Sequence, residues 1–115
     1  MFSGGWAAVH NPLCTQTVTI YSRTPQGVTR QVVGGCYYQW QKTVDADGME
    51  QTAFLLVLPG TVAINPGDRV YEGVGPESVV WEQFLPVNTH GLAQVAYVTP
   101  YYFQNRLHHI EAGRK

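Results

Sequence analysis

Charged side chains are scarce in this 115-residue chain. They make up 13% of the residues, against the roughly 25% that is usual. Lys and Arg together number seven and Asp and Glu eight, so the formal net charge is −1. We therefore do not expect a face basic enough to bind nucleic acid through its phosphates. Little charge repulsion would separate copies of the chain, so the composition suits a homo-oligomer.

Cysteine is almost absent as well. Cys14 and Cys36 are the only two, and an isolated pair without close spacing is neither a metal-binding nor a redox pattern. We expect reduced thiols, as in a cytosolic assembly compartment, with a Cys14–Cys36 disulfide as the alternative. Residues 1–8 lack the basic and apolar segments of a signal peptide. No apolar run approaches the ~20 residues of a membrane-spanning helix, so no membrane partner is expected.

Recognisable catalytic motifs are missing too. No serine lies in a nucleophile-elbow sequence, and Cys36 with a remote histidine is not a thiol-enzyme signature. The glycines at Gly34, Gly35, Gly60 and Gly67 lie at turns between predicted strands with no helix following, so none forms a phosphate-binding loop. We therefore predict that the chain is not an enzyme and uses no cofactor.

What the sequence does contain is a series of short segments typical of β-strands. The segment that organises the rest is Ala53–Gly73, in which an apolar run ends at Leu58, Pro59-Gly60 breaks the chain, and a turn follows at Asn65–Asp68. The continuous apolar run predicts burial on both faces of its strand. Within the turn, proline presets φ at the second position and glycine supplies a positive φ at the third, as a type II turn requires.

Alternating residues and turn signals predict a mostly β fold, a small β-barrel or sandwich with at most one short helix. Gly34-Gly35 permits a bulge or bend, and Pro100-Tyr101-Tyr102 is expected to interrupt pairing. A helix start at 75–77 and i,i+4 apolar pairs predict a helix over about 77–84, with a strand over 78–84 as the alternative. The predicted strands cover residues 16–22, 28–33, 36–44, 50–58, 62–64, 69–72, 92–99 and 106–112.

The first residues differ in composition from the rest of the chain. Residues 1–15 are rich in glycine and small side chains, with Phe2 and Trp6 as isolated aromatic anchors. We interpret them as an extended N-terminal arm that covers a neighbouring subunit, with a frayed terminus as the alternative. The β domain then spans residues 16–115.

Two polar clusters are candidates for metal binding. On a strand, His109 and Glu111 point to one face while His108 points to the other, and His90 could join from elsewhere. Because two ligands on one strand rarely suffice, we favour a polar strand end or a subunit interface. The second cluster, Asp45, Asp47 and Glu50, lacks the rest of a calcium-loop pattern and is interpreted as a solvated hairpin tip.

Tyr101, Tyr102 and Phe103 form a run of three aromatics. They cannot all face inward on a strand, so at least one is exposed or covered by a partner. A stacking platform for single-stranded nucleic acid would need basic neighbours, and only Arg106 is near. Because Tyr and Phe rings are common interface anchors, we predict a subunit interface. Its candidate residues are Phe2, Trp6, Tyr101, Tyr102, Phe103, His109 and Glu111.

Several features occur in an order that resembles a known family. They are Thr17-Val18-Thr19-Ile20-Tyr21, Trp40, the apolar strand Ala53–Leu58 ending in Pro59, Asn65-Pro66-Gly67-Asp68 followed by Val70 and Gly73, and the ending His109-Ile110-Glu111-Ala112-Gly113-Arg114-Lys115. The set resembles the minor capsid or head–tail connector proteins of tailed phages, which include stopper-like head-completion proteins. The resemblance spans about residues 16–115, and the loop after Pro59 is shorter than is usual in that family.

The resemblance implies a virion subunit, assembled in the host cytoplasm, that forms a homo-oligomeric ring between portal and tail. Packaged DNA would pass nearby without sequence-specific binding. Asp45, Asp47 and Glu50 would then face the lumen, because a basic lumen would hold the DNA phosphates. The alternatives are a tail-terminator or tail-tube subunit, or a small SH3-like or OB-like binding module of cellular origin.

Overall fold

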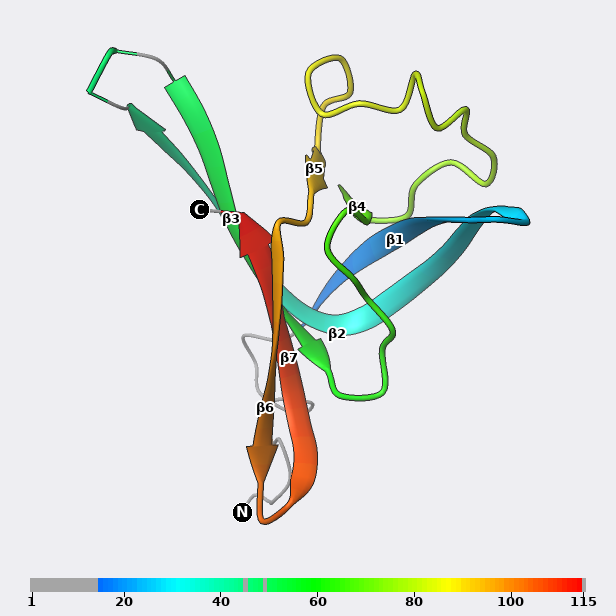
Figure 1. The fold of residues 1–115 in the computed structure, drawn as a ribbon, viewed down its shortest axis with the longest axis vertical. Coiled ribbons are helices and arrows are strands. Elements are labelled where there is room, and N and C mark those ends of the chain that lie inside the picture. Colours follow the sequence, from blue (N-terminus) through cyan, green and yellow to red (C-terminus); the bar gives the residue numbers. More distant parts are fainter. Residues whose placement is uncertain (1–14, 45, 49, 115) are drawn as a thin grey trace.

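The computed structural model describes residues 15–44, 46–48 and 50–114. Seven antiparallel strands form one curled sheet, a half-barrel, in the order β5-β4-β1-β2-β3-β7-β6 (Figure 1). The described residues contain no helix long and apolar enough to cross a membrane. The predicted mostly β, barrel-like fold is confirmed. The strands are β1 (Gln16–Thr24), β2 (Gly27–Val44), β3 (Glu50–Pro59), β4 (Arg69–Glu72), β5 (Leu92–Gln94), β6 (Tyr97–Phe103) and β7 (Arg106–Arg114).

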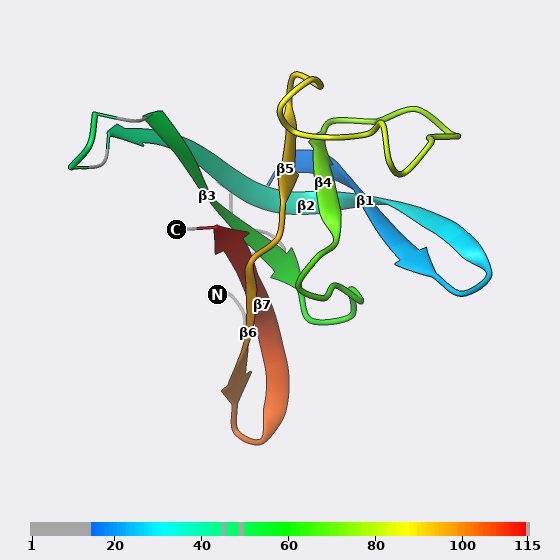
Figure 2. The ribbon, with the colours of Figure 1, turned by 45° about the horizontal axis from the view of Figure 1, so that its top comes forward.

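Strand β2 is long and bent, and it joins the two halves of the sheet (Figure 2). Its first part pairs with β1 and its second part with β3. The β1–β2 register shifts where Gly34 and Gly35 lie, and Gly35 has a φ of 67°. The predicted bulge is therefore confirmed, and the two strands expected over 28–33 and 36–44 are one strand bent at the glycines.

The two edge strands, β5 and β6, follow one another in the chain. Between them, Val95 exchanges backbone hydrogen bonds with Gly67 and Asp68, both 2.8 Å, and the Ala96 N–H donates to the Gly113 carbonyl at 2.8 Å. The chain thus passes from one half of the sheet to the other here, which splits the strand predicted over 92–99. The interruption predicted at residues 100–102 is wrong, because proline is tolerated on an edge strand such as β6.

The main core lies between the two halves of the sheet. Phe54, Leu56 and Leu58 of β3 are buried in it, whereas Leu55 and Val57 on the other face are half-buried. The prediction that this strand is buried on both faces is therefore wrong, because its second face lacks a full cover. The core cluster also contains Val18, Ile20, Val33, Cys36, Ile64, Val70, Ala93, Val95, Ile110 and Ala112.

Residues 60–68 connect β3 to β4 without forming the strand predicted over 62–64. Ile64 is nevertheless buried in the core, so its apolar character reports packing and not strand pairing. The turn at 65–68 is as predicted: Gly67 has a φ of 95°, and the Asp68 N–H donates to the Asn65 carbonyl at 3.1 Å. The Asp68 carboxylate also accepts from the Asn65 N–H at 2.9 Å, which fixes the start of β4.

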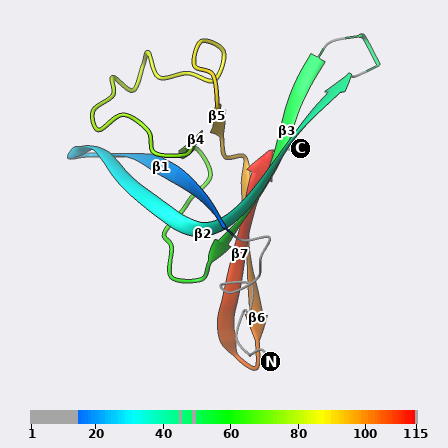
Figure 3. The ribbon, with the colours of Figure 1, turned by 180° about the vertical axis from the view of Figure 1, so that it is seen from behind.

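Residues 73–91, which we name the covering loop, lie over the outer face of β1 and β4 (Figure 3). Neither the helix predicted over 77–84 nor the alternative strand is present. One helix-like bond forms, from the Phe84 N–H to the Val80 carbonyl at 2.9 Å. The carbonyls of Trp81 and Phe84 instead accept hydrogen bonds from Arg69, so tertiary contacts replace the helical pattern. Residues 1–14 of the predicted arm, with Phe2, Trp6 and Cys14, lie outside the described residues.

Candidate functional site

The β6–β7 hairpin extends away from the rest of the sheet (Figure 1). Its strands pair from Tyr97 and Gly113 to Phe103 and Arg106 at the turn. The two turn residues between them have φ values of 50° and 65°, so both adopt the left-handed conformation of a type I′ turn. Such a turn matches the twist of the two strands and holds the end of the hairpin in a defined orientation.

Large apolar side chains gather at this end of the hairpin. The exposed fractions are 42% for Tyr101, 65% for Tyr102, 63% for Phe103 and 40% for Leu107. We name these four residues the hairpin tip. The prediction that at least one of the three consecutive aromatics is exposed is confirmed, and in fact all three are. Tyr102 pairs with Leu107, whereas Tyr101 and Phe103 contact the two histidines on the other face of the hairpin. Exposed large apolar side chains gathered at one end of a molecule mark an interaction site on many soluble proteins.

A histidine pair supports the base of the tip. The β6–β7 register passes from Tyr101–His109 to Tyr102–Leu107, so His108 is an extra residue on β7. This bulge explains why the Nδ1 atoms of two consecutive histidines approach to 3.0 Å. The His109 ring stacks on Tyr101, with centroids 4.8 Å apart and an interplanar angle of 3°.

Glu111 fixes the orientation of this pair. The His109 Nε2 lies 3.1 Å from the Glu111 Oε2, which confirms that the two side chains share a face of β7. Because a carboxylate only accepts hydrogen bonds, a neutral His109 donates from Nε2 and accepts at Nδ1 from His108. The prediction that His108 would lie on the opposite face misses the bulge, which the sequence does not signal.

The ligand set considered for a metal ion is not assembled in the described part of the chain. There, no group of three or more His, Cys, Asp or Glu side chains is placed to hold a metal. His90 is exposed in the covering loop, and His109 and Glu111 bond directly to each other. Their geometry is that of a hydrogen-bonded support for Tyr101.

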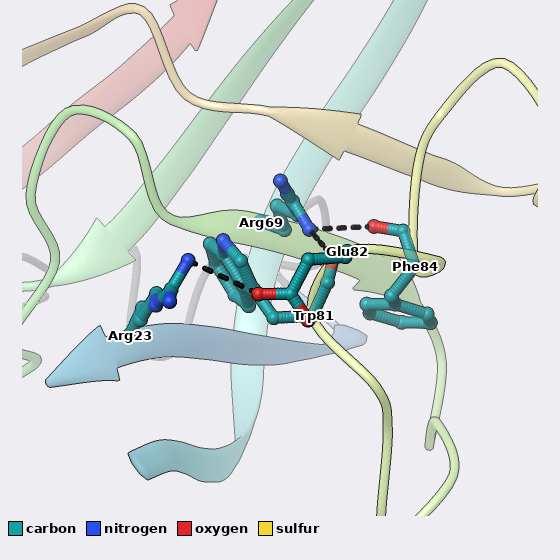
Figure 4. Close-up of polar contacts among 5 residues, drawn as sticks. All are labelled: Arg23, Arg69, Trp81, Glu82 and Phe84. Carbon is teal, nitrogen blue, oxygen red and sulfur yellow. Dashed lines mark hydrogen bonds and ion pairs between the residues drawn. The ribbon is translucent and has the colours of Figure 1, made fainter. Parts of the chain in front are cut away.

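Sequence reasoning missed the centre that holds the covering loop, which is Arg69 (Figure 4). Its side chain is buried, with 7% of its surface exposed. Its Nη1 donates to the carbonyls of Trp81 and Phe84, the latter at 2.9 Å, and its guanidinium carbon lies 3.8 Å from the centroid of the Trp81 ring. Burial lowers the pKa of Arg69, and the nearby Glu82 charge opposes this effect.

The aromatic side of the covering loop packs on the same face of the sheet. Phe84 makes an edge contact with the buried Tyr21, with centroids 4.7 Å apart, and stacks on Tyr71 at 6.3 Å. By contrast, the Arg23–Glu82 ion pair at 3.3 Å is largely exposed, so its contribution to stability is small. The loop is therefore held by buried contacts and not by surface charge.

Hydroxyl groups of β1 bind the start of the covering loop. Thr19 Oγ1 donates to the Gly73 carbonyl at 2.7 Å and accepts from the Gly75 N–H at 2.8 Å. The Tyr21 hydroxyl donates to the Pro76 carbonyl at 2.6 Å, and burial raises the pKa of this phenol. A Cβ at Gly75 would collide with the Tyr21 hydroxyl oxygen, so this position requires glycine.

An open pocket of about 360 Å³ lies where the covering loop, β5 and the end of β7 meet. Its walls are mainly apolar, and we name it the apolar pocket. Val87, on its rim, is 88% exposed. No sequence pattern predicted it, since its walls come from three separate segments. They are formed by Leu85, Pro86, Val87, Leu92, Ala93, Gln94 and Arg114.

The acidic cluster predicted at the end of the β2–β3 hairpin is described in part. Asp47 lies exposed between the two strands. Asp45 lies outside the described residues, as does the side chain of Glu50. Cys36 is fully buried in the main core, and its thiol donates to the Val33 carbonyl at 3.3 Å.

The described residues thus define a mostly β protein, a seven-stranded half-barrel with a projecting aromatic hairpin. Comparison of the chain with protein-family models, with curated proteins and with solved structures finds no match.

Proposed function

We propose that this chain is a non-enzymatic virion protein, a head–tail connector subunit of the stopper-like, head-completion type. Copies of it form a ring between the portal and the tail, and they bind portal or adaptor proteins on one side and tail proteins on the other. The observation that carries the proposal is the hairpin tip, whose Tyr102 and Phe103 are 65% and 63% exposed on a projecting hairpin.

The shape of the hairpin supports a role in assembly. A domain of this size has little reason to expose two aromatic rings at the end of one hairpin unless a partner covers them, because each ring buries ~150–250 Å² when covered. The type I′ turn and the Tyr101–His109 stack hold the tip in place, so little conformational entropy is lost on binding.

Charge distribution supports passage of DNA through the ring. The formal net charge of −1 means that the chain has no excess of basic groups, and Asp47 is exposed at the end of the β2–β3 hairpin. We assign this hairpin end, with Asp45, Asp47 and Glu50, to the lumen, where acidic groups would let phosphates pass without holding them. If a ring structure placed this hairpin end on the outer surface, that assignment would be wrong.

The experiment is assembly on the portal. The full chain, mixed with the portal protein encoded in the same genome, is expected to form a ring on the portal that electron microscopy resolves. Binding to a preformed tail tube and not to the portal would favour a tail-terminator or tail-tube subunit. A chain that remains monomeric with either partner would favour a cellular SH3-like or OB-like module and contradict the proposal.

A further inference from the structure

We infer that the hairpin tip of one copy inserts into the apolar pocket of the next copy. The inference rests on the proposed function and deepens it, because it states how neighbouring subunits contact one another. Both surfaces are exposed on the same chain. Strand β5, which lines the pocket, lies in the upper part of Figure 1, and the end of the β6–β7 hairpin lies at the bottom, so the hairpin tip does not reach the pocket of its own chain.

The pocket has room for an aromatic side chain. Its volume is about 360 Å³, and an apolar cavity of about 150 Å³ is already able to bind benzene. The rings of Tyr102 and Phe103 are the most exposed aromatics of the hairpin tip. A ring placed among Leu85, Pro86 and Leu92 would remove apolar surface from water on both partners.

The polar groups of the pocket suit an incoming tyrosine or phenylalanine. The Arg114 guanidinium could lie over a ring face, as cations do when they contact aromatic side chains. The Gln94 amide offers a donor and an acceptor to the hydroxyl of Tyr102. With a net charge of −1 on each copy, long-range repulsion does not oppose the contact.

A contact between two different surfaces is head-to-tail, and it closes into a ring when the rotation between copies allows. The hairpin tip alone is too small for a stable interface, since two rings bury ~300–500 Å² while a standard interface buries about 800 Å² per partner. We therefore expect the flanks of the hairpin to contribute as well, with Tyr102 as the central anchor and Phe103, on the opposite face of the hairpin, beside it.

The test uses two variants that each leave the other surface intact. Tyr102→Ser with Phe103→Ser removes the anchors, and Val87→Glu places a charge on the pocket rim. All three positions are exposed, so the variants should fold. We expect the wild-type chain to self-associate in sedimentation velocity, and each variant to raise the dissociation constant at least ~30-fold.

Mixing the two variants separates a head-to-tail contact from other arrangements. The Val87→Glu variant keeps its hairpin tip and the Tyr102→Ser/Phe103→Ser variant keeps its apolar pocket. A 1:1 heterodimer should therefore form and nothing larger. A photocrosslinker, p-benzoylphenylalanine, at position 102 should link to residues 85–94 of another copy, whereas the same probe at the exposed Val28 should not. A mixture that stays monomeric, or a crosslink elsewhere, would overturn the inference.

The result is distinguishable from a failure of the proposed function. If both variants still self-associate, the contact between hairpin tip and apolar pocket is wrong. Assembly on the portal is tested separately, by electron microscopy. A wild-type chain that is monomeric at all concentrations would overturn the contact as well. Conversely, variants that behave as expected in a chain that never binds a portal would support the contact and contradict the connector.

Discussion

The covering loop and the β6–β7 hairpin both carry large aromatic side chains, yet they place these side chains in opposite environments. Phe84 of the loop is 7% exposed and packs on Tyr21, whereas Phe103 of the hairpin is 63% exposed. The two regions differ in how their backbones are satisfied. The hairpin pairs its own strands, while the loop has no regular structure and depends on donors from the sheet.

Those donors come from a few polar side chains on the outer face of β1, β2 and β4. Arg69 and Thr19 are buried there, and Arg30 donates to the Gly75 and Pro76 carbonyls at 2.7 and 3.0 Å. Because the carbonyls of the covering loop have hydrogen-bond donors, its aromatic rings can pack against the sheet. Aromatic residues alone therefore do not make a segment part of the core. The covering loop joins the core because side chains of the sheet satisfy its backbone carbonyls.

The largest expected difference is between the two phenylalanines. Phe84→Ala should lower the free energy of unfolding by about 3–4 kcal/mol, because it removes a buried ring. Phe103→Ala should change it by less than about 0.5 kcal/mol, because that ring is exposed. Urea denaturation of dilute, monomeric protein measures both. Equal losses for the two variants would mean that the hairpin tip is part of the core.

The next effect concerns the two arginines that contact the covering loop. Arg69→Ala leaves two carbonyls without their buried donor and removes the contact with Trp81, so a loss of about 3 kcal/mol is expected. Arg23→Ala is the matched control, because it breaks only the exposed pair with Glu82 and should cost at most about 0.5 kcal/mol. If Arg23→Ala proved the costlier substitution, surface charge would hold the loop.

A smaller effect is expected for the threonine of β1. Thr19→Val keeps the shape of the side chain but removes the bonds to Gly73 and Gly75, which should cost about 2 kcal/mol. Thr29→Val on β2 removes an exposed hydroxyl bond to the Ser22 carbonyl and should cost less than about 0.5 kcal/mol. Hydrogen exchange should also show faster opening of the covering loop in Thr19→Val, and unchanged exchange would argue against this anchor.

The smallest effect is a pH dependence from Tyr21. Burial raises the pKa of its phenol above the value of 10.0 expected in the unfolded chain. The unfolded chain therefore loses this proton first, so the stabilisation is full below pH 10 and is lost as the pH rises toward the folded-state pKa. The slope from one such group is at most about 1.4 kcal/mol per pH unit.

Tyr21→Phe provides the control for this dependence, since it removes the hydroxyl and keeps the ring. The variant should be less stable than the wild type at neutral pH, because the bond to Pro76 is lost. The gap between the two proteins should narrow above pH 10. A constant gap up to pH 11.5 would show that Tyr21 does not cause the dependence.

The features that could be predicted from the sequence are those set by residues close together in the chain. The strand segments, the turn at 65–68 and the bulge at Gly34-Gly35 follow from alternation, proline and glycine. The shared face of His109 and Glu111 follows from the two-residue period of a strand, and the exposure of the 101–103 run follows from its three consecutive aromatics. Each of these depends on a residue's immediate neighbours, so the sequence carries the signal.

The burial of both faces of β1 and the bulge in β7 could not be predicted, because they depend on segments that are distant along the chain. Residues 18–21 of β1 are buried on both faces although their pattern alternates, because the covering loop packs on the outer face. The apolar run of β3 lacks such a cover and is half-buried on one face. The bulge at His108 depends on the pairing of β7 with β6, which no local signal specifies.

The sequence by itself therefore determined a mostly β chain with few charges and an exposed aromatic run. The tertiary structure decided where that run is presented, on a projecting hairpin, and it placed the apolar pocket far from it. The physical reason is that strand periodicity is local, whereas the covering of a surface requires that two distant segments meet. The proposed contact between copies depends on this second kind of information.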